Sequence, residues 1–453
     1  MIGRKAEKDI NNWLDGNGRH ALLVTGARQT GKTTLIRSVL SGRSMVFTEF
    51  NFAEKPELIS RCTEAIQKGA VFFASLLPLM AGHPIPEGSI VFFDEVQDCP
   101  EIITSIKYLV ENGKYRYIMS GSLLGVEFSN LRSAPVGFLS ILDMFPLGFE
   151  EFIRAFGGSD ELFERLRFCF ENTVRIDNVI HEQLLDLFYK YLVIGGMPEA
   201  VQKYIDTQDF YAVSNIHDEI RKLYTIDFCR YEDNDKKLKL RKIYELIPSE
   251  LDAENRRYVF TDIDPHFKFD RYENSFNWLI DSGVAIAVHN VREPMIPLPA
   301  NRERNLLKLF LSDCGMLTSA YGPSTQLKLL QREEFVNNGA VFENYVAEEL
   351  CLRGRSLYYS SIKKYGEIDF IREETGRVSL IEVKSGKDYR KHSSLDRYLS
   401  VPNWDIGNAY VLCTGNIERE GRITYLPIYL TYLIAEERKP ELPGIRIDLS
   451  ALR

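Results

Sequence analysis

Residues 26–33 have the clearest spacing of any chemistry-bearing pattern in the chain. They read Gly-Ala-Arg-Gln-Thr-Gly-Lys-Thr, which fits G-x-x-x-x-G-K-[ST]. The two glycines permit a close backbone approach that a Cβ would block, so successive N–H groups can hold phosphate oxygens. Lys32 then adds a positive charge at the β- and γ-phosphates, and the Thr33 hydroxyl is a ligand for Mg²⁺. The residues that we expect to bind a nucleotide are Gly26, Ala27, Arg28, Gln29, Thr30, Gly31, Lys32, Thr33 and Thr34.

Two acids at the end of an apolar run supply the second half of such a site. Residues 90–93 read Ile-Val-Phe-Phe, and Asp94 and Glu95 follow them. Asp94 is expected to join the nucleotide site through the Mg²⁺ shell, and Glu95 to polarise the attacking water. An apolar strand that ends in Asp-Glu is common by itself, but its position downstream of a phosphate loop favours a role for both acids in a nucleotide site. A water-activating glutamate indicates ATP hydrolysis and argues against a small-molecule kinase.

A third group of polar residues lies in the last third of the chain. Residues 339–350 have helical spacing with an apolar stripe. Residues 365–371 and 378–384 have strand patterns, and the alternation of the second strand places Glu382 and Lys384 on the same face as Leu380. The four polar residues of interest are Glu343, Asp369, Glu382 and Lys384.

A glutamate on a helix, an aspartate on a strand and then Glu-x-Lys is similar to the PD-(D/E)XK nuclease fold. The resemblance implies that Asp369 and Glu382 bind Mg²⁺, that Lys384 helps to activate water, and that Glu343 supports the metal shell. The chemistry would be metal-assisted phosphodiester hydrolysis. Two alternatives remain open: a salt-bridged hairpin on a wet face, or a scaffold of this fold that binds without cutting.

The phosphate loop works only if a strand precedes it and a helix follows it. Residues 21–24 are an apolar run of buried-strand type, and residues 34–40 have helical spacing. A plain glycine turn before a helix is the alternative, which the agreement of strand, loop and helix disfavours. Further strand patterns lie at 44–50 and 115–122, and helical patterns at 4–15, 56–68 and 101–111. This alternation predicts an α/β fold, a P-loop NTPase parallel sheet flanked by helices, with ligand at the strand carboxyl ends.

Together these motifs resemble a large group of prokaryotic AAA+-type ATPases. The resemblance rests on Gly-Ala-Arg-Gln-Thr-Gly-Lys-Thr-Thr-Leu, Phe-Phe-Asp-Glu-Val-Gln and Met-Ser-Gly-Ser, and on the later landmarks 146–152 and 195–198. It runs over nearly the whole chain and implies ATP and Mg²⁺ as ligands, with a C-terminal domain of unassigned function. In ATPases of this kind a polar side chain at the end of a strand such as 115–122 senses the γ-phosphate. Ser120 or Ser122 is the candidate here.

The chain departs from this group at one position. The group carries Gly-Arg a few residues before the 146–152 landmark, where this chain has Gly137 and Phe138. The nearest arginine is Arg132, which becomes the candidate for stabilising the charge of the transferred phosphoryl group. The departure bears on the efficiency of hydrolysis rather than on nucleotide binding. It also leaves open whether a homo-oligomer completes the site with a neighbour's arginine.

The middle of the chain changes character twice. Residues 153–235 have mostly helical patterns, and 236–242 form a basic run. A helix pattern ending at Gly283 and a following β-run over 284–288 predict a winged helix-turn-helix. Its basic residues would contact DNA phosphates, or the module would instead pack against its neighbours and relay the nucleotide state. The basic residues are Lys236, Lys237, Lys239 and Arg241.

We therefore expect four domains. They are an AAA+ P-loop ATPase core over 1–155, a lid-like helical extension over 156–230, a winged helix-turn-helix over 231–300, and a restriction-endonuclease-like α/β domain over 301–453.

Composition narrows the class of protein. The 453 residues carry a net charge of −8, with 45% hydrophobic and 26% charged residues, as in an ordinary soluble protein. No apolar run has the length of roughly 18–20 residues that a membrane span needs, and the first residues lack a signal-peptide h-region. Seven scattered cysteines without a C-x-x-C pair predict free thiols in a reducing compartment, so the cytoplasm is the expected location.

The expected function is that of an ATP-binding, Mg²⁺-dependent ATPase whose nucleotide state controls a C-terminal nuclease-like or DNA-binding module. The alternative is a signalling or defence-type ATP switch whose C-terminal half is a non-catalytic scaffold for protein interaction.

Overall fold

Five parallel strands form the first sheet, and the phosphate loop follows β1, which lies between β4 and β5. The computed structural model describes residues 2–16, 19–122, 137–228, 234–252, 272–333, 338–352 and 356–436. The strand order is β2-β3-β4-β1-β5. The bounds are β1 Ala21–Thr25, β2 Phe47–Asn51, β3 Ile90–Asp94, β4 Arg116–Gly121 and β5 Leu139–Asp143. The parallel α/β sheet expected from the sequence is therefore present.

Helices cover both faces of this sheet because successive strand residues point to opposite sides. Leu22 and Val24 pack with α1 and α2, whereas Leu23 packs with α3, α4 and α5. The bounds are α1 Ala6–Asp15, α2 Lys32–Gly42, α3 Glu57–Gln67, α4 Ala70–Ala81, the 3₁₀ helix η1 Val96–Asp98 and α5 Pro100–Asn112. The sequence did not predict α4, whose apolar residues form no stripe, or β5, an edge strand without a buried apolar run.

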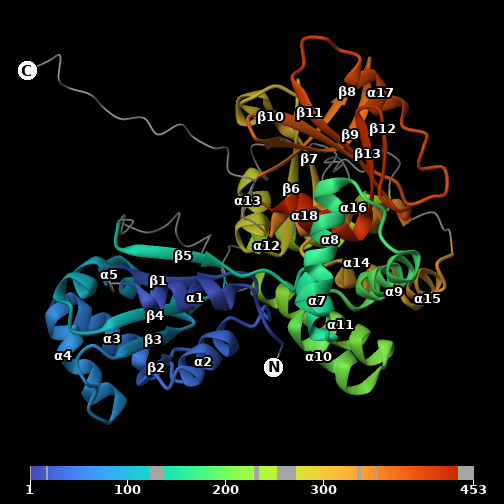
Figure 1. Ribbon diagram of the computed structural model, residues 1–453. Helices are drawn as coiled ribbons and strands as arrows, with labels where there is room; N and C mark the ends of the chain where they lie inside the picture. Colours follow the sequence, from blue (N-terminus) through green and yellow to red (C-terminus); the bar gives the residue numbers. More distant parts are fainter. Residues whose placement is uncertain are drawn as a thin grey trace, which may run out of the picture.

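A layer of helices follows the first sheet and lies beside it (Figure 1). These helices are α7 Phe149–Ala155, α8 Asp160–Asn172, α9 Asn178–Ile194, α10 Pro198–Thr207 and α11 Phe210–Phe228. Two more, α12 Asn234–Asp252 and α13 Glu273–Asp281, lead towards the second sheet. The helical character expected for this stretch is confirmed in its described residues.

The second sheet has eight strands in the order β12-β13-β11-β10-β9-β8-β6-β7. Their bounds are β6 Ala285–Val291, β7 Arg302–Leu311, β8 Leu357–Ile362, β9 Gly366–Glu374, β10 Arg377–Val383, β11 Ile406–Cys413, β12 Glu418–Glu420 and β13 Ile423–Pro427. Strand β6, which the sequence suggested as part of a wing, pairs with β7 in a hairpin and with β8 on its other side. The hairpin is thus built into this sheet, and the expected domain boundary at 300 falls between its two strands.

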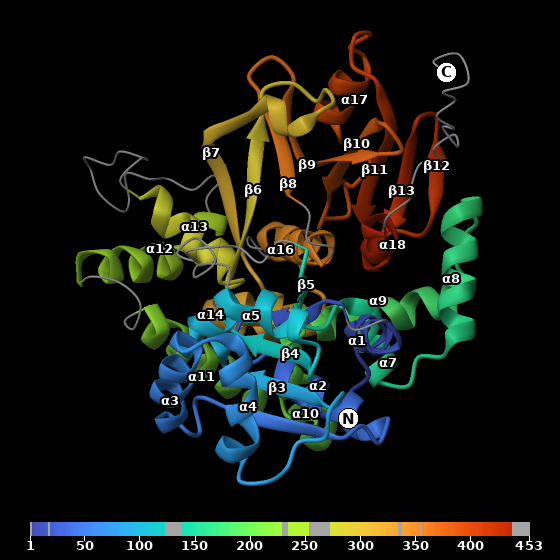
Figure 2. The same cartoon turned by 90° about the vertical axis from the view of Figure 1, so that its left-hand side faces the viewer.

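Helices also cover both faces of the second sheet. Side chains of α16, among them Phe342 and Tyr345, share a core with Ile381, whereas Tyr398 of α17 packs with Leu380 on the other face. Figure 2 shows α16 between this sheet and α14. The bounds are η4 Leu298–Asn301, α14 Cys314–Tyr321, α15 Pro323–Leu330, α16 Asn338–Cys351, α17 Ser393–Leu399, η5 Ile428–Leu430 and α18 Thr431–Ala435.

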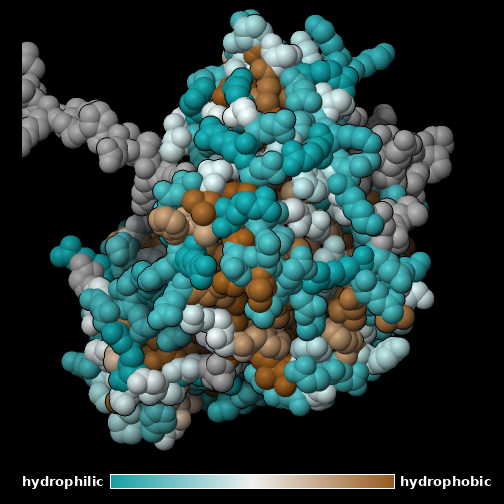
Figure 3. Space-filling model, turned by 45° about the vertical axis from the view of Figure 1, so that its right-hand side comes forward, coloured by the Kyte–Doolittle hydropathy of each residue, from teal (hydrophilic) through white to brown (hydrophobic). Residues whose placement is uncertain are grey.

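The largest hydrophobic core runs from the helical layer into the second sheet without a break. Apolar side chains also gather across the middle of the face shown in Figure 3, between more polar upper and lower parts. The cysteines of the described residues are free thiols, and none of the described helices combines the length and apolar character that a membrane crossing requires.

One main-chain pairing joins the ATPase sheet, the helices and the second sheet. The Leu147 N–H donates to the Gly196 carbonyl at 2.7 Å, and the Gly196 N–H donates to Asp313 Oδ2 at 2.6 Å. A Cβ on Gly196 would lie 2.1 Å from the Leu147 oxygen, and one on Gly195 would lie 2.2 Å from Asp313 Oδ1. The two glycines are therefore required by the close approach of three segments.

Buried glutamates of α16 complete this junction. Glu348 accepts from the Tyr191 hydroxyl at 2.6 Å and from the Cys314 N–H at 2.9 Å. Glu349 accepts from the N–H of Phe149, the first residue of α7. The C-terminal half is thus hydrogen-bonded directly to the chain that leaves the ATPase sheet.

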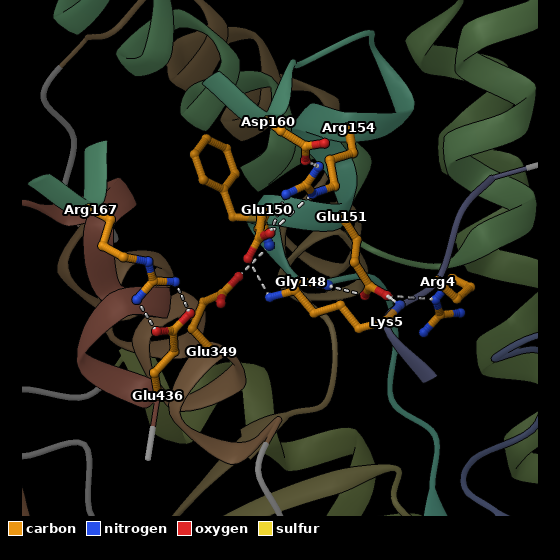
Figure 4. A network of polar contacts seen from close by, with 11 residues as sticks. Arg4, Lys5, Gly148, Glu150, Glu151, Arg154, Asp160, Arg167, Glu349 and Glu436 are labelled. Atoms are coloured by element: carbon orange, nitrogen blue, oxygen red, sulfur yellow. Dashed lines mark hydrogen bonds and ion pairs between the residues drawn. The ribbon is translucent and has the colours of Figure 1, made fainter. Parts of the chain in front are cut away.

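The N-terminal segment is attached to the same place. Glu151 accepts from the Lys5 N–H at 2.6 Å, from Arg4 Nε at 3.2 Å and from the Gly148 N–H at 3.2 Å. Figure 4 shows these side chains converging beside Glu349. The start of the chain, α7 and α16 therefore share one polar network.

The buried carboxyl of Glu349 makes a prediction about stability and pH. Burial raises its pKa from 4.5 to about 7, although the hydrogen bond from Phe149 opposes this. The folded state therefore holds the proton more tightly than the unfolded state, and the free energy of unfolding falls as pH rises from about 4.5 to about 7. Glu349→Gln removes this loss, so we expect the variant to gain on the order of 1–3 kcal/mol over wild type at pH 8 and far less at pH 5.

Urea unfolding midpoints at pH 5 and pH 8 measure the effect. Glu161→Gln, at an exposed position of α8, is the matched control for the loss of one carboxylate. An equal offset of Glu349→Gln at both pH values would contradict the prediction.

Candidate functional site

The phosphate loop leaves β1 at Thr25 and ends where α2 begins, at Lys32. Gly26 and Gly31 have φ angles of 139° and 87°, in the region that favours glycine. A Cβ on Gly26 would also lie 2.0 Å from the Met144 carbonyl oxygen. The first N–H groups of α2 thus face the loop, which makes its concave side a site for an anion.

Lys32 lies inside this loop. Its Nζ donates to the Ala27 carbonyl at 2.8 Å and to the Gly26 carbonyl at 2.9 Å. Burial lowers the pKa of Lys32 to about 8, while the charges of Glu95 and Asp94 act in the opposite direction. The loop residues behind Lys32 are ordered by the Thr30 hydroxyl, which donates to the Ala27 carbonyl at 2.9 Å.

Asp94 is the centre of a hydrogen-bond network at the carboxyl end of β3. The Thr33 hydroxyl donates to Asp94 Oδ1 at 2.8 Å, and the Ser120 hydroxyl donates to the same oxygen. Asn51, at the end of β2, donates to Oδ2 at 2.9 Å. Burial raises the pKa of Asp94, and the hydrogen bonds from Ser120 and Thr33 oppose that rise. The structure therefore brings the two expected Mg²⁺ ligands together, and adds Asn51, which the sequence motifs did not indicate.

Glu95 follows in a left-handed conformation with φ 55°, which is costly for a residue other than glycine and is typical of functional sites. Its Oε2 accepts from Gln97 Nε2 at 2.5 Å and from the Ser122 hydroxyl at 3.4 Å. The two candidate sensor serines are thus divided between the two acids, Ser120 on Asp94 and Ser122 on Glu95. Arg132 lies outside the described residues.

A cavity of about 340 Å³ adjoins the loop on its outer side. Its walls come from three separate parts of the chain: Ile2 and Arg4 at the start, Thr34 and Leu35 on α2, and Pro198 on α10. Arg4 is held there because its Nη1 donates to the Thr30 carbonyl at 2.9 Å. Pro198 belongs to the 195–198 landmark of the family resemblance, so that landmark forms part of the wall beside the nucleotide loop.

Three of the four C-terminal candidate residues, Asp369, Glu382 and Lys384, lie together. Glu382 and Asp369 are close enough that the charge of Asp369, after burial, raises the pKa of Glu382 to about 7. Lys384 Nζ donates to Glu382 Oε1 at 2.8 Å, and Asp369 Oδ2 accepts from the Val383 N–H at 2.8 Å. Glu382 Oε2 is buried and has no hydrogen-bond partner.

Glu343 belongs to a buried ion pair with Lys308, whose charge also acts on Glu382. The side chain of Lys308 on β7, 1% exposed, lies 3.4 Å from Glu343 Oε2 and 2.8 Å from Glu367 Oε1. Among the described residues, no three His, Cys, Asp or Glu side chains are grouped so that they could hold a metal ion. The sequence did not indicate Lys308, because its partners are 35 and 59 residues further along the chain.

The residues fit a metal at Asp369 and Glu382 better than at Glu343. The unpartnered oxygen of Glu382 and the repulsion between the two carboxylates both leave negative charge for a cation to neutralise. Glu343 and Glu382 each already face an ammonium group, that of Lys308 and that of Lys384 respectively. What distinguishes Glu382 is its buried Oε2, which has no hydrogen-bond partner and lies beside a second carboxylate.

The basic run of the expected winged helix lies on α12, and part of its charge is engaged. Arg241 Nε pairs with Glu245 Oε1 at 2.7 Å, and Lys239 lies over the Tyr272 ring at 4.7 Å. The side chain of Lys236 lies outside the described residues. A DNA-binding role for this run stays a prediction.

Comparison with solved structures finds distant likenesses. A Walker-type ATPase of Pyrococcus abyssi is 15% identical, with a TM-score of 0.42, over 71% of this chain and 96% of that chain. The ORC1 protein of Aeropyrum pernix, solved in complex with DNA, is 14% identical with a TM-score of 0.29, over 73% of this chain and 94% of that one. The RuvB Holliday junction branch migration motor of Thermotoga maritima is 15% identical with a TM-score of 0.30, over 65% and 90%.

Family models match three parts of the chain, and no curated protein matches it. Residues 185–327 match a domain of unknown function (DUF8612), and residues 338–431 match another (DUF4143). Residues 18–153 match an AAA domain. The part of the chain that carries the phosphate loop, Asp94 and Glu95 is therefore an AAA-type P-loop ATPase domain.

Proposed function

We propose that this protein is a Mg²⁺-dependent ATPase that couples hydrolysis to its C-terminal half. The observation that carries the proposal is the convergence of Thr33 and Ser120 on Asp94, with Glu95 directly beyond it. A phosphate loop alone binds a nucleotide, whereas an acid placed beyond the metal-binding carboxylate gives the site a base for water.

Each residue of the site has a distinct task in this proposal. The N–H groups of the loop and Lys32 bind the phosphates, and Thr33 and Asp94 hold the cation. Mg²⁺, when bound, neutralises charge on the β- and γ-phosphates. Glu95 orients the attacking water and accepts its proton, and Gln97 and Ser122 fix the carboxylate that does so.

The cavity beside the loop is where we place the base and ribose of the nucleotide. Its volume of about 340 Å³ suits a small ligand, and it opens next to Gly31 and Thr34, at the helix end of the phosphate loop. Pro198 and Ile2 offer apolar surface to a planar base.

Two substitutions separate binding from turnover. Lys32→Ala removes the charge that binds the β- and γ-phosphates, so we expect affinity for Mg·ATP to fall at least about 100-fold. Glu95→Gln keeps the shape of the site without its base, so binding stays within about threefold while turnover falls at least about 100-fold. Isothermal titration and phosphate release measure the two quantities.

Lys203→Ala, at an exposed position of α10, is the matched lysine control, and EDTA is expected to stop turnover in wild type. Normal turnover in Glu95→Gln would show that Glu95 is not the base. Undiminished binding in Lys32→Ala would overturn the nucleotide site itself.

A second candidate function is favoured by the unpartnered oxygen of Glu382 beside Asp369. In this proposal the pair binds a divalent cation, Lys384 lies beside it, and the C-terminal domain hydrolyses phosphodiester bonds. The alternative is that this half is a non-catalytic scaffold for another protein.

Mn²⁺ binding followed by electron paramagnetic resonance tests the pair. We expect Glu382→Gln and Asp369→Asn each to lose one bound Mn²⁺ per chain, because each removes a ligand charge. Glu343→Gln is expected to keep it, because Glu343 faces Lys308 instead. With Mn²⁺ and supercoiled DNA, wild type is expected to nick and Lys384→Ala to lose nicking. Unchanged Mn²⁺ binding in Glu382→Gln, with no nicking by wild type, would favour the scaffold.

A further inference from the structure

Arg28, the third residue of the phosphate loop, is held by two different parts of the protein at once. Its Nε lies 2.9 Å from Asp227 Oδ2 on α11 and donates to the Ser122 hydroxyl at 3.3 Å. Its main-chain carbonyl accepts from the Tyr224 hydroxyl, one turn earlier on α11, at 3.0 Å. A residue of the nucleotide loop is thus attached to a helix almost 200 positions away in the chain.

The side chain also lies at the catalytic end of the loop. The Ser122 hydroxyl that it contacts donates in turn to Glu95 Oε2. Glu95 is the residue proposed to orient water at the terminal phosphate, so the Arg28 guanidinium lies next to where that phosphate must be. The positive charge of Arg28 is also felt by Lys32, whose pKa it lowers as one of several contributions. Two neighbouring cations favour an anion between them.

α11 ends one residue after Asp227. That last residue, Phe228, packs edge-to-face on Trp278 of α13, with ring centroids 5.3 Å apart. After α13 the chain turns at Gly283, where an added Cβ would lie 3.2 Å from the Ala27 N, and enters β6. The loop, α11, α13 and the second sheet therefore form one continuous set of contacts.

We propose that Arg28 binds the γ-phosphate of ATP in its own chain, and that it leaves Asp227 of α11 when it does so. The exchange of partners gives the active site an arginine that the chain lacks at position 138. It also frees the Asp227 end of α11, so that the presence of the γ-phosphate is transmitted through Phe228 and Trp278 to β6. This inference rests on the proposed ATPase function.

The affinities for Mg·ADP and Mg·AMP-PNP test the exchange. In Arg28→Met we expect binding of AMP-PNP to weaken at least about tenfold and that of ADP to change less than about threefold. The turnover number is expected to fall at least about 100-fold, as for other arginines that contact the transferred phosphoryl group. Asp227→Asn removes the competing anion, so AMP-PNP should bind about threefold more tightly, with ADP unchanged. Arg37→Met on α2, which removes a surface pair with Glu49 on β2, is the matched control and should change neither affinity.

Tryptophan fluorescence tests the transmission. The chain has three tryptophans, and a Trp13→Phe, Trp404→Phe background leaves Trp278 as the reporter. AMP-PNP but not ADP should change its emission, and Arg28→Met should abolish that change. Equal weakening of ADP and AMP-PNP by Arg28→Met would make Arg28 a structural loop residue and overturn the inference. If wild type binds neither nucleotide, the ATPase proposal itself fails, whereas normal turnover in Arg28→Met overturns the inference and leaves the ATPase intact.

Discussion

The close approach of Leu147 to Gly196 is the constraint on which the rest of the structure depends. This main-chain pairing at 2.7 Å brings the end of the ATPase sheet against the turn before α10, and the side chain of Asp313 closes it from the C-terminal half. Glycine at 195 and 196 is the condition for that approach, because a Cβ at either place would overlap the opposite segment. The segment after the ATPase sheet, the turn before α10 and the C-terminal half are thus in direct contact at this point.

The Leu147–Gly196 junction also positions the residues that surround the nucleotide loop. Pro198 lies beside Gly31 because the pairing at Gly196 places the start of α10 there, and Arg4 reaches Thr30 because α7 holds its guanidinium through Glu151. The loop is therefore in contact with the helical layer and with the start of the chain as well as with its own sheet. A change in loop conformation must be accommodated by these neighbours, since packed interiors respond to small shifts.

The sequence predicted the parts of the site whose geometry is local. The phosphate loop and the strand that ends in Asp94 are defined by neighbours in the chain, and the structure has both where they were expected. It did not predict Lys308 beside Glu343, or Asp227 beside Arg28, because each pairing joins residues on different elements and carries no periodic signal. The hairpin β6–β7 is a related case. The β-run over 284–288 was indicated by its own pattern, but whether β6 also pairs with β8 depends on a partner strand more than sixty residues away.

The partner exchange at Arg28 also sets a limit on what ATP can do to the C-terminal half. A ligand shifts a conformational equilibrium only by the ratio of its affinities for the two states. If one arginine binds the γ-phosphate and raises the affinity for ATP about tenfold in one of the two states, the equilibrium of α11 can shift by about 1.4 kcal/mol. Such a shift changes an equilibrium of one to one to about ten to one, but it does not reverse an equilibrium that strongly favours the other state. A C-terminal half controlled in this way must therefore be close to balance before ATP binds, or must receive the remaining bias from DNA or a protein partner at the second sheet.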